Sequence, residues 1–290
     1  MSFVVITNWL YKHKDKLHYI ISMETVLTNG FVRLVDTMPR EDLDDSIVQA
    51  ARVSYGDGTT ASRSPEGLIR YLLRHWHTTP FEMIEFKFHM KMPIFVARQH
   101  LRHRMASVNE VSARYSVVNN DVFIPKDYRV QSSINKQSSE GVLENSETIR
   151  TDVTAVCEHA FQVYNSAIDS GCSRELARCH LPQSTFTEFY WKINLHNLLH
   201  YLQLRMDSGA QTEIGMYAHA IYKLVEPLVP LTMKAFMDFR VNSIQLTGPE
   251  IALLVNNQIS QDEIDLTPGE KREFIDKLKR MGLFKTNGVQ

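Results

Sequence analysis

The clearest pattern in this chain is a strict alternation of apolar and polar residues between positions 84 and 92. The apolar positions are Ile84, Phe86, Phe88, Met90 and Met92. Successive side chains of a strand point to opposite faces, so the pattern predicts a strand with one buried face and one polar face. Such strands are typical of antiparallel sheets. Residues 30–36 alternate in the same way, and residues 184–193 are aromatic and β-branched, which predicts two more strands.

Other segments repeat apolar residues every three to four positions, which predicts amphipathic helices. We expect these helices over residues 42–51, 64–76, 149–168, 194–205, 211–228 and 231–239. Ser64 and Asn194 are capping residues at two of the helix starts. The helix over 149–168 should bury a side that includes Val156. A further helix should open at Pro93 and end near Arg102, and a loop should follow it.

Two strong strands between helical blocks predict an α+β fold, and the chain lacks the regular strand–helix alternation of a doubly wound sheet. It also lacks a Gly-x-Gly-x-x-Gly fingerprint and a Gly-Lys-Ser/Thr loop. Residues 1–29 are interpreted as an N-terminal extension. Residues 129–147 are rich in Ser, Asn, Gln and Glu, which predicts a surface insertion that lacks a packed core. A capping box over 267–270 begins the last helix of a predicted helical tail, residues 241–290.

Composition restricts the class of partner and the compartment. The chain has 290 residues, 43% of them hydrophobic, and a formal net charge of −1, which is not typical of a polyanion-binding protein. Its three cysteines form neither a paired disulfide framework nor a zinc pattern. Lysines interrupt the apolar N-terminus, and no apolar run approaches the roughly 20 residues that span a bilayer. We therefore expect a cytoplasmic, reducing setting, with no membrane and no nucleic-acid partner.

The densest cluster of candidate chemistry is the segment 99–115. It contains Arg102, His103, Arg104 and Arg114, with Glu110 among them. Guanidinium groups present a planar fork of donors that matches phosphate oxygens, so the segment suggests a phosphate-binding pocket. The alternative is a solvated loop whose arginines pair with the acidic segment 40–45. Composition alone does not decide between these two interpretations.

The segment Arg-His-Arg-x-x-Ser-x-Asn-Glu-x-Ser-x-Arg-Tyr, residues 102–115, resembles the signature of the flavin-dependent thymidylate synthases at every specified position. Residues 77–82, His-x-Thr-Pro-Phe-Glu, resemble a second block of that family, although Met83 stands where His is frequent. Residues 190–194, 202–205 and 210–211 resemble a third block. The resemblance covers roughly residues 30–240, which we interpret as the family domain.

This resemblance implies a curved, mainly antiparallel sheet flanked by helices. It also implies a homotetramer that shares active sites between subunits and converts dUMP to dTMP with FAD, NADPH and methylenetetrahydrofolate. By aligned position, the expected FAD contacts are Thr79, Arg102, His103, Arg104, Met105, Glu110, Asn194, His196 and His200. The expected dUMP contacts are Gln99, His100, Leu101, Arg102, Glu110, Val111, Ser112, Ala113, Arg114, Arg178 and Arg205.

Two positions depart from the family pattern, because many members have Arg where His196 stands and Asn where His200 stands. Histidine can still stack or donate a hydrogen bond, so both residues are kept as expected FAD contacts. No metal site is expected, because His196 and His200 have no Glu between them in the zinc-protease pattern.

Methylation of uracil at C5 requires that carbon to become nucleophilic. A cysteine thiolate could add to the ring, but Cys157, Cys172 and Cys179 have no obvious base in the sequence. A reduced flavin could instead deliver hydride, and Arg205 is the expected catalytic residue because it stays protonated beside the pyrimidine. Two alternatives remain: a flavin- and nucleotide-binding homologue without methyl transfer, and a nucleic-acid-binding module that uses residues 98–114.

Overall fold

The computed structural model describes residues 22–55, 63–132 and 139–284. These residues fall into two compact units that divide after Phe236. A turn, which the Gly-Asp-Gly sequence over 56–58 favours, and most of the N-terminal extension lie outside the described residues. The boundaries 30–240 and 241–290 of the family domain and the tail stay a prediction.

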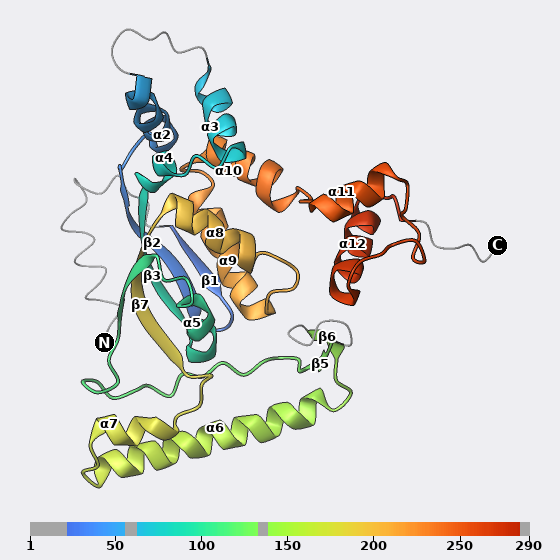
Figure 1. The fold of residues 1–290 in the computed structure, drawn as a ribbon. Helices are drawn as coiled ribbons and strands as arrows, with labels where there is room; N and C mark the ends of the chain where they lie inside the picture. The colour runs from blue at the N-terminus through green and yellow to red at the C-terminus, as the bar shows by residue number, and fades with distance from the viewer. Residues whose placement is uncertain (1–21, 56–62, 133–138, 285–290) are drawn as a thin grey trace. The chain divides into compact units, whose positions relative to one another are not determined.

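The first unit contains a five-stranded antiparallel sheet in the order β1-β2-β3-β7-β4 (Figure 1). Its strands are β1 (Met23–Val26), β2 (Gly30–Met38), β3 (Glu85–Pro93), β4 (Ala106–Glu110) and β7 (Phe186–Asn194). The strands predicted over 30–36, 84–92 and 184–193 correspond to β2, β3 and β7. The predicted α+β class and the antiparallel sheet are therefore confirmed.

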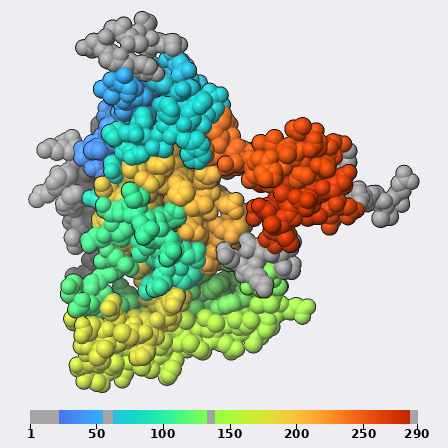
Figure 2. Space-filling model, viewed as in Figure 1, coloured from blue at the N-terminus to red at the C-terminus, as the bar shows by residue number. Residues whose placement is uncertain are grey.

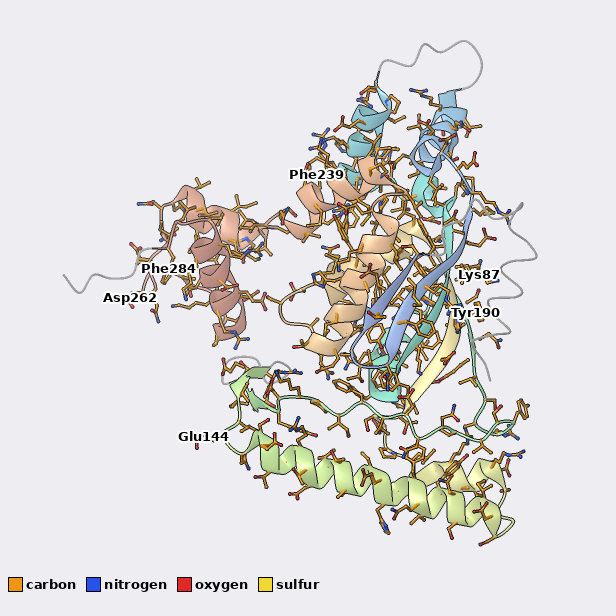
Figure 3. All side chains as sticks on the ribbon, turned by 180° about the vertical axis from the view of Figure 1, so that it is seen from behind. Lys87, Glu144, Tyr190, Phe239, Asp262 and Phe284 are labelled. Carbon is orange, nitrogen blue, oxygen red and sulfur yellow. The ribbon has the colours of Figure 1, made fainter. Side chains whose placement is uncertain are left out.

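The alternation in β3 divides its side chains between two faces of the sheet. Its five apolar residues from Ile84 to Met92 are completely buried, as is Trp191 on the neighbouring strand β7. Helices α5 (Ile94–His100), α8 (Leu195–Arg205) and α9 (Thr212–Val225) cover this face (Figure 1). Lys87 and Tyr190 project from the other face, and the ammonium of Lys87 lies 5.4 Å from the Tyr190 ring centre (Figure 3).

Further helices of this unit gather at one end of the sheet. They are α2 (Leu43–Arg52), α3 (Pro65–Arg74), α4 (Thr79–Glu82) and α10 (Pro230–Phe236), and a 3₁₀ turn, Val53–Tyr55, follows α2. Ser64 caps α3 as expected, because its hydroxyl accepts a hydrogen bond from the Gly67 amide at 3.1 Å. The predicted helix was too long, however. Trp76 lies beyond the end of α3 with a positive φ of 60° and is 61% exposed.

Helix α6 (Ser146–Asp169) and the short α7 (Arg174–Ala177) form a band along one edge of this unit (Figure 2). A 3₁₀ turn, Arg178–His180, follows α7. The buried side of α6 consists of Ser146, Cys157, Phe161 and Tyr164. Val156 was expected on that side, but it is 66% exposed. The helical pattern of α6 therefore predicted its extent better than its orientation.

The predicted insertion over 129–147 is not without structure. Strands β5 (Arg129–Gln131) and β6 (Ser139–Val142) form a two-stranded antiparallel sheet, although Arg129 is half-buried and the other residues of both strands are exposed. Residues 106–110 were also predicted as a loop, but they form edge strand β4. Exposed Ser107, Asn109 and Glu110 give this strand its polar sequence, which hid it from a prediction based on alternating burial.

The second unit begins with a π-helical turn, Met237–Val241, and contains α11 (Gly248–Val255) and α12 (Pro268–Arg280). The predicted capping box at Thr267 and Glu270 is present, and Thr247 and Glu250 form another. The two helices pack around a small core of Leu253, Ile259, Ile264, Phe274 and Leu278. Lys277 donates to the buried Glu250 carboxylate at 2.8 Å.

Replacing Phe88 with alanine should lower the free energy of unfolding by about 3–5 kcal/mol, because a completely buried ring is lost from the centre of the sheet. Urea denaturation would measure the loss. Val156→Ala is the control, and this exposed position should change stability by less than about 0.5 kcal/mol. Similar losses for the two variants would contradict this account of the core.

Candidate functional site

A cavity of about 710 Å³ lies where β4 ends beside β7. The residues from Glu110 to Ala113 lie on one of its walls, and Arg178 lies on another. These residues are five of the eleven expected dUMP contacts. Lys91, Asp121, Cys179, Thr187 and Glu188 also line the cavity. The fold therefore brings together two segments that are more than 60 positions apart in the chain.

The carboxylate of Glu110 is held in place at this cavity. Thr187 Oγ1 donates to Glu110 Oε1 at 2.6 Å, and the Val111 amide donates to the Glu188 carbonyl at 2.9 Å. The Val111 bond extends the pairing of β4 with β7 past the last residue of β4. The adjoining wall carries an ion pair between Lys91 and Asp121, whose N–O distance is 2.6 Å.

Glu175 of helix α7 contacts two arginines, Arg114 and Arg178. Arg114 Nη2 lies 3.4 Å from Glu175 Oε2, and Arg178 Nε donates to the Glu175 carbonyl at 3.4 Å. Both arginines are exposed, so each guanidinium has donors that can reach an anion from solvent. Two cations beside a walled cavity suit a phosphate group.

Arg205, His103 and Gln99 form a second group, at the ends of α8 and α5. Arg205 Nε donates to His103 Nε2 at 3.1 Å, and its Nη2 donates to the Gln99 carbonyl at 3.2 Å. Arg205 also lines a cavity of about 490 Å³ with residues of α9. It does not line the cavity of Glu110 and Arg178 in a single chain. The expected dUMP contacts are therefore divided between two places.

Burial and nearby cations keep the imidazole of His103, and that of neighbouring His100, neutral. Burial, Arg205 and His200 lower the pKa of His103 to about 4. Because Arg205 donates to Nε2, neutral His103 carries its proton on Nδ1. Burial lowers the pKa of His100 to about 3, and its Nδ1 lies 3.1 Å from the Tyr201 hydroxyl. His100 is completely buried, side chain and backbone alike, so a single chain exposes no atom of it to a ligand.

The expected flavin contacts surround this group only in part. Arg102, Arg104 and Met105 are exposed on the turn after α5, and no acidic partner of either arginine is present among the described residues. The His200 ring centre lies 5.9 Å from that of His103. Asn194 caps α8 by accepting from the Asn197 amide at 2.9 Å. Thr79 begins α4, which packs on α8, the helix that carries His196.

Four residues with prominent contacts were given no role in the sequence analysis: Thr187, Gln211, Glu213 and Arg129. Thr187 stands in the aromatic and β-branched strand predicted over 184–193. Glu213 lies in the first turn of α9, where an acid is normally explained by the helix dipole. Its burial, at 4% exposure, is the signal of another role, and it becomes visible only in the fold. In the described part of the chain, no helix is long and apolar enough to cross a membrane.

Comparison with known proteins decides the family. The model of the family described as "Thymidylate synthase complementing protein" matches residues 33–231. A flavin-dependent thymidylate synthase of Dictyostelium discoideum is 51% identical over 231 residues, which cover 77% of this chain and 76% of the relative. The chain belongs to the family of flavin-dependent thymidylate synthases. It is a flavoprotein enzyme that makes dTMP, as the motif over 102–115 predicted.

Two further comparisons support the assignment of this synthase. The flavin-dependent thymidylate synthase of Ruegeria pomeroyi is 44% identical over 267 residues, which cover 88% of this chain and 87% of the relative. A crystal structure of the UMP/dUMP methylase PolB from Streptomyces cacaoi, bound with 5-Br dUMP, has a TM-score of 0.67 and 33% identity. That match covers 75% of this chain and 98% of the other. The family assignment replaces the nucleic-acid-binding alternative.

The folding stability of the synthase should fall as the pH is lowered from 6.5 toward 4. In the unfolded chain His103 takes a proton near its ordinary pKa of 6.5, whereas in the folded chain it does so only near 4. Between these values the unfolded state binds more protons, so acid favours unfolding. Urea midpoints from pH 7.5 to 5 would measure the slope.

His103→Gln should flatten that slope, although buried His100 will leave part of it in the variant. The control is His159→Gln, at an exposed position on α6, which should keep the wild-type slope. An unchanged slope in His103→Gln would contradict the account of His103.

Proposed function

We propose that this synthase converts dUMP to dTMP with methylenetetrahydrofolate as carbon donor and NADPH as reductant, through bound FAD. The one-carbon unit and two electrons replace the C5 hydrogen of uracil with a methyl group, and tetrahydrofolate and NADP⁺ are the other products. The observation that carries the proposal is the cavity lined by Glu110–Ala113 and Arg178, with Arg114 beside it.

Arg114 and Arg178 are proposed to bind the phosphate of dUMP. Both guanidinium groups reach Glu175, and both are exposed, so a phosphate could take up the donors that solvent now satisfies. Ser112 lies on the wall of the same cavity and can add a hydroxyl donor. The 5-Br dUMP bound by the Streptomyces relative supports a pyrimidine nucleotide as the ligand.

The residues around His103 fit a flavin nucleotide. Arg102 and Arg104 offer two exposed cations for a pyrophosphate, and His103 offers an Nδ1–H donor. We propose these residues as FAD contacts, together with Thr79, Met105, Glu110, Asn194, His196 and His200. When bound, the flavin supplies the hydride chemistry that the side chains lack. The chain's own groups bind, orient and polarise the substrate.

Arg205 is the proposed catalytic residue. Its Nε and Nη2 are held by His103 and the Gln99 carbonyl, which fixes the plane of the guanidinium. The remaining donors can bind the edge of the pyrimidine, where a permanent cation stabilises negative charge that develops on the ring. A neutral His103 is required for this arrangement, because a protonated imidazole could not accept from Arg205.

The cysteines do not supply the nucleophile in this proposal. Cys179 lines the cavity, but its thiol donates to the Glu175 carbonyl at 3.3 Å. No histidine lines that cavity among the described residues, so no imidazole is placed to activate the thiol. Cys157 is buried, and none of the three cysteines is in a disulfide. Free thiols agree with the proposed intracellular, reducing setting.

The division of the site supports active sites shared between subunits, and the number of subunits, a homotetramer, is proposed from the family resemblance. One chain carries Glu110–Ala113 and Arg178 at one cavity and Arg205 with Gln99 at another place. If both sets bind one dUMP molecule, a neighbouring subunit must complete the site.

Replacing Arg205 with alanine should abolish dTMP formation while flavin absorbance is largely retained. Arg178→Ala should instead weaken dUMP binding, because it removes a proposed phosphate ligand. Product formation, flavin content and dUMP affinity would be measured for each variant. Flavin binding and dUMP affinity without dTMP formation in the wild type would favour the homologue without methyl transfer.

Mixing the two variants tests the shared site. Subunits with Arg205→Ala and Arg178→Ala, refolded together, should form dTMP faster at low dUMP than either variant alone, because some sites then receive both arginines from different chains. Each variant refolded alone is the control. No recovery in mixed oligomers would contradict a site divided between subunits in this way.

A further inference from the structure

A line of polar contacts leads from Gln99 to the insertion over 129–147. It runs from the Gln99 amide to Gln211, then to Glu213, and ends at Arg129 on β5. Gln211 Nε2 donates to Glu213 Oε2 at 2.8 Å, and Arg129 Nη2 donates to Glu213 Oε1 at 2.7 Å. The Glu213 side chain is 5% exposed and the Arg129 side chain 30%. A carboxylate so buried requires these partners.

The buried Glu213 carboxylate sets the direction of both amide hydrogen bonds in the line. An ionised carboxylate only accepts hydrogen bonds, so Gln211 must turn its NH₂ toward Glu213. Its oxygen then faces Gln99, and Gln99 must donate its own NH₂ to that oxygen. The side-chain carbonyl oxygen of Gln99 is consequently left to accept a bond from elsewhere. Without the carboxylate, either amide could be flipped at little cost.

The backbone of Gln99 is fixed at the same time. Its carbonyl accepts from Arg205 Nη2, so Gln99 is held by the proposed catalytic arginine on one side and by Gln211 on the other. Arg129 is itself secured, because its Nε donates to Ser139 Oγ in β6 at 2.8 Å. The insertion hairpin is thereby tied to a proposed substrate contact.

We infer that Glu213 and Arg129 are positioning residues for the synthase reaction: they orient the Gln99 amide so that its carbonyl oxygen accepts a hydrogen bond from dUMP. This inference rests on the proposed function, in which Gln99 contacts dUMP. The nucleotide offers two donors of the right kind, the uracil N3–H and the sugar 3′-hydroxyl. Neither Glu213 nor Arg129 touches the substrate, and each acts through Gln211 and Gln99.

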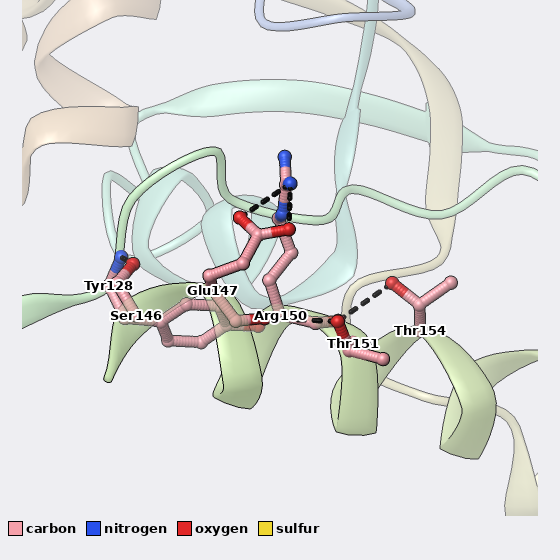
Figure 4. Close-up of polar contacts among 6 residues, drawn as sticks. All are labelled: Tyr128, Ser146, Glu147, Arg150, Thr151 and Thr154. Carbon is pink, nitrogen blue, oxygen red and sulfur yellow. Dashed lines mark hydrogen bonds and ion pairs between the residues drawn. The ribbon is translucent and has the colours of Figure 1, made fainter.

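Two variants and one control separate positioning from general stability. Glu213→Gln is isosteric but can donate as well as accept, so it no longer fixes the direction of the line. Arg129→Gln removes the cation that pairs with Glu213 and, being partly exposed, should fold. The control is Arg150→Gln on α6, where Arg150 Nη2 donates to exposed Glu147 at 2.6 Å, outside the line (Figure 4).

We expect the Kd for dUMP, measured by calorimetry on the flavin-loaded enzyme, to rise about tenfold in Glu213→Gln and Arg129→Gln, the loss of roughly one hydrogen bond. Their flavin content and their kcat at saturating dUMP should stay within about twofold of wild type. Arg150→Gln should bind dUMP as the wild type does. If the two variants lose only thermal stability and keep the wild-type Kd, their role is structural and the inference fails.

Substrate analogues identify which donor of dUMP the side-chain oxygen of Gln99 accepts a hydrogen bond from. Either 3-methyl-dUMP, which lacks N3–H, or 2′,3′-dideoxy-UMP, which lacks the 3′-hydroxyl, should bind about tenfold more weakly than dUMP to the wild type. The same analogue should bind Glu213→Gln with little further loss. Equal penalties in the wild type and the variant would overturn the inference. A wild type that fails to bind dUMP would instead overturn the proposed function.

Discussion

The antiparallel pairing of β4 with β7 is the constraint on which the site depends. It places Asn109 opposite Tyr190 and Glu110 opposite Phe189, and so brings the arginine-rich segment to the cavity beside Arg178. A slip of one residue would move every side chain of β4 to the opposite face. Buried Trp191 and Ile193 prevent that slip in β7 itself, because the sheet packs on helices through these side chains. An edge strand with few buried residues thus takes its register from its buried neighbour.

Strand β7 also connects the cavity of Glu110 and Arg178 with the group of Arg205, His103 and Gln99. On one side, β7 provides Thr187, which holds Glu110. At its other end, Asn194 caps α8, and α8 delivers Arg205 to His103 and Gln99. The residues proposed to bind the phosphate and the arginine proposed to polarise the ring are therefore positioned by one element, although within a single chain they line different cavities.

Much of the fold could be predicted because the relevant signals are local. Strict alternation over 84–92 assigned each side chain to a face, and the caps at Ser64 and Asn194 marked helix starts within a residue. Failures occurred where local signals were weak. Strand β4 is polar because it is an edge, and Val156 follows the helical pattern of α6 although its side chain is exposed.

The candidate site was predictable only as far as its chemistry lies in a motif. The close spacing of the arginines over 102–114 predicts anion binding, and the family resemblance predicts which of them contact FAD and which contact dUMP. Other contacts near the site join residues that are distant in sequence: Thr187 is 77 positions from Glu110, and Glu213 is 84 positions from Arg129. Nothing in the neighbourhood of Glu213 distinguishes it from an ordinary first-turn acid, and only the fold reveals its burial.

The most direct test of the account is the visible spectrum of the purified enzyme during anaerobic addition of NADPH, with and without dUMP. We predict a yellow protein whose flavin absorbance is bleached by NADPH, and bleached faster when dUMP is bound. A folded but colourless protein, or a rate of bleaching that dUMP does not change, would contradict the proposal that substrate and flavin share the site built by β4, β7 and α8.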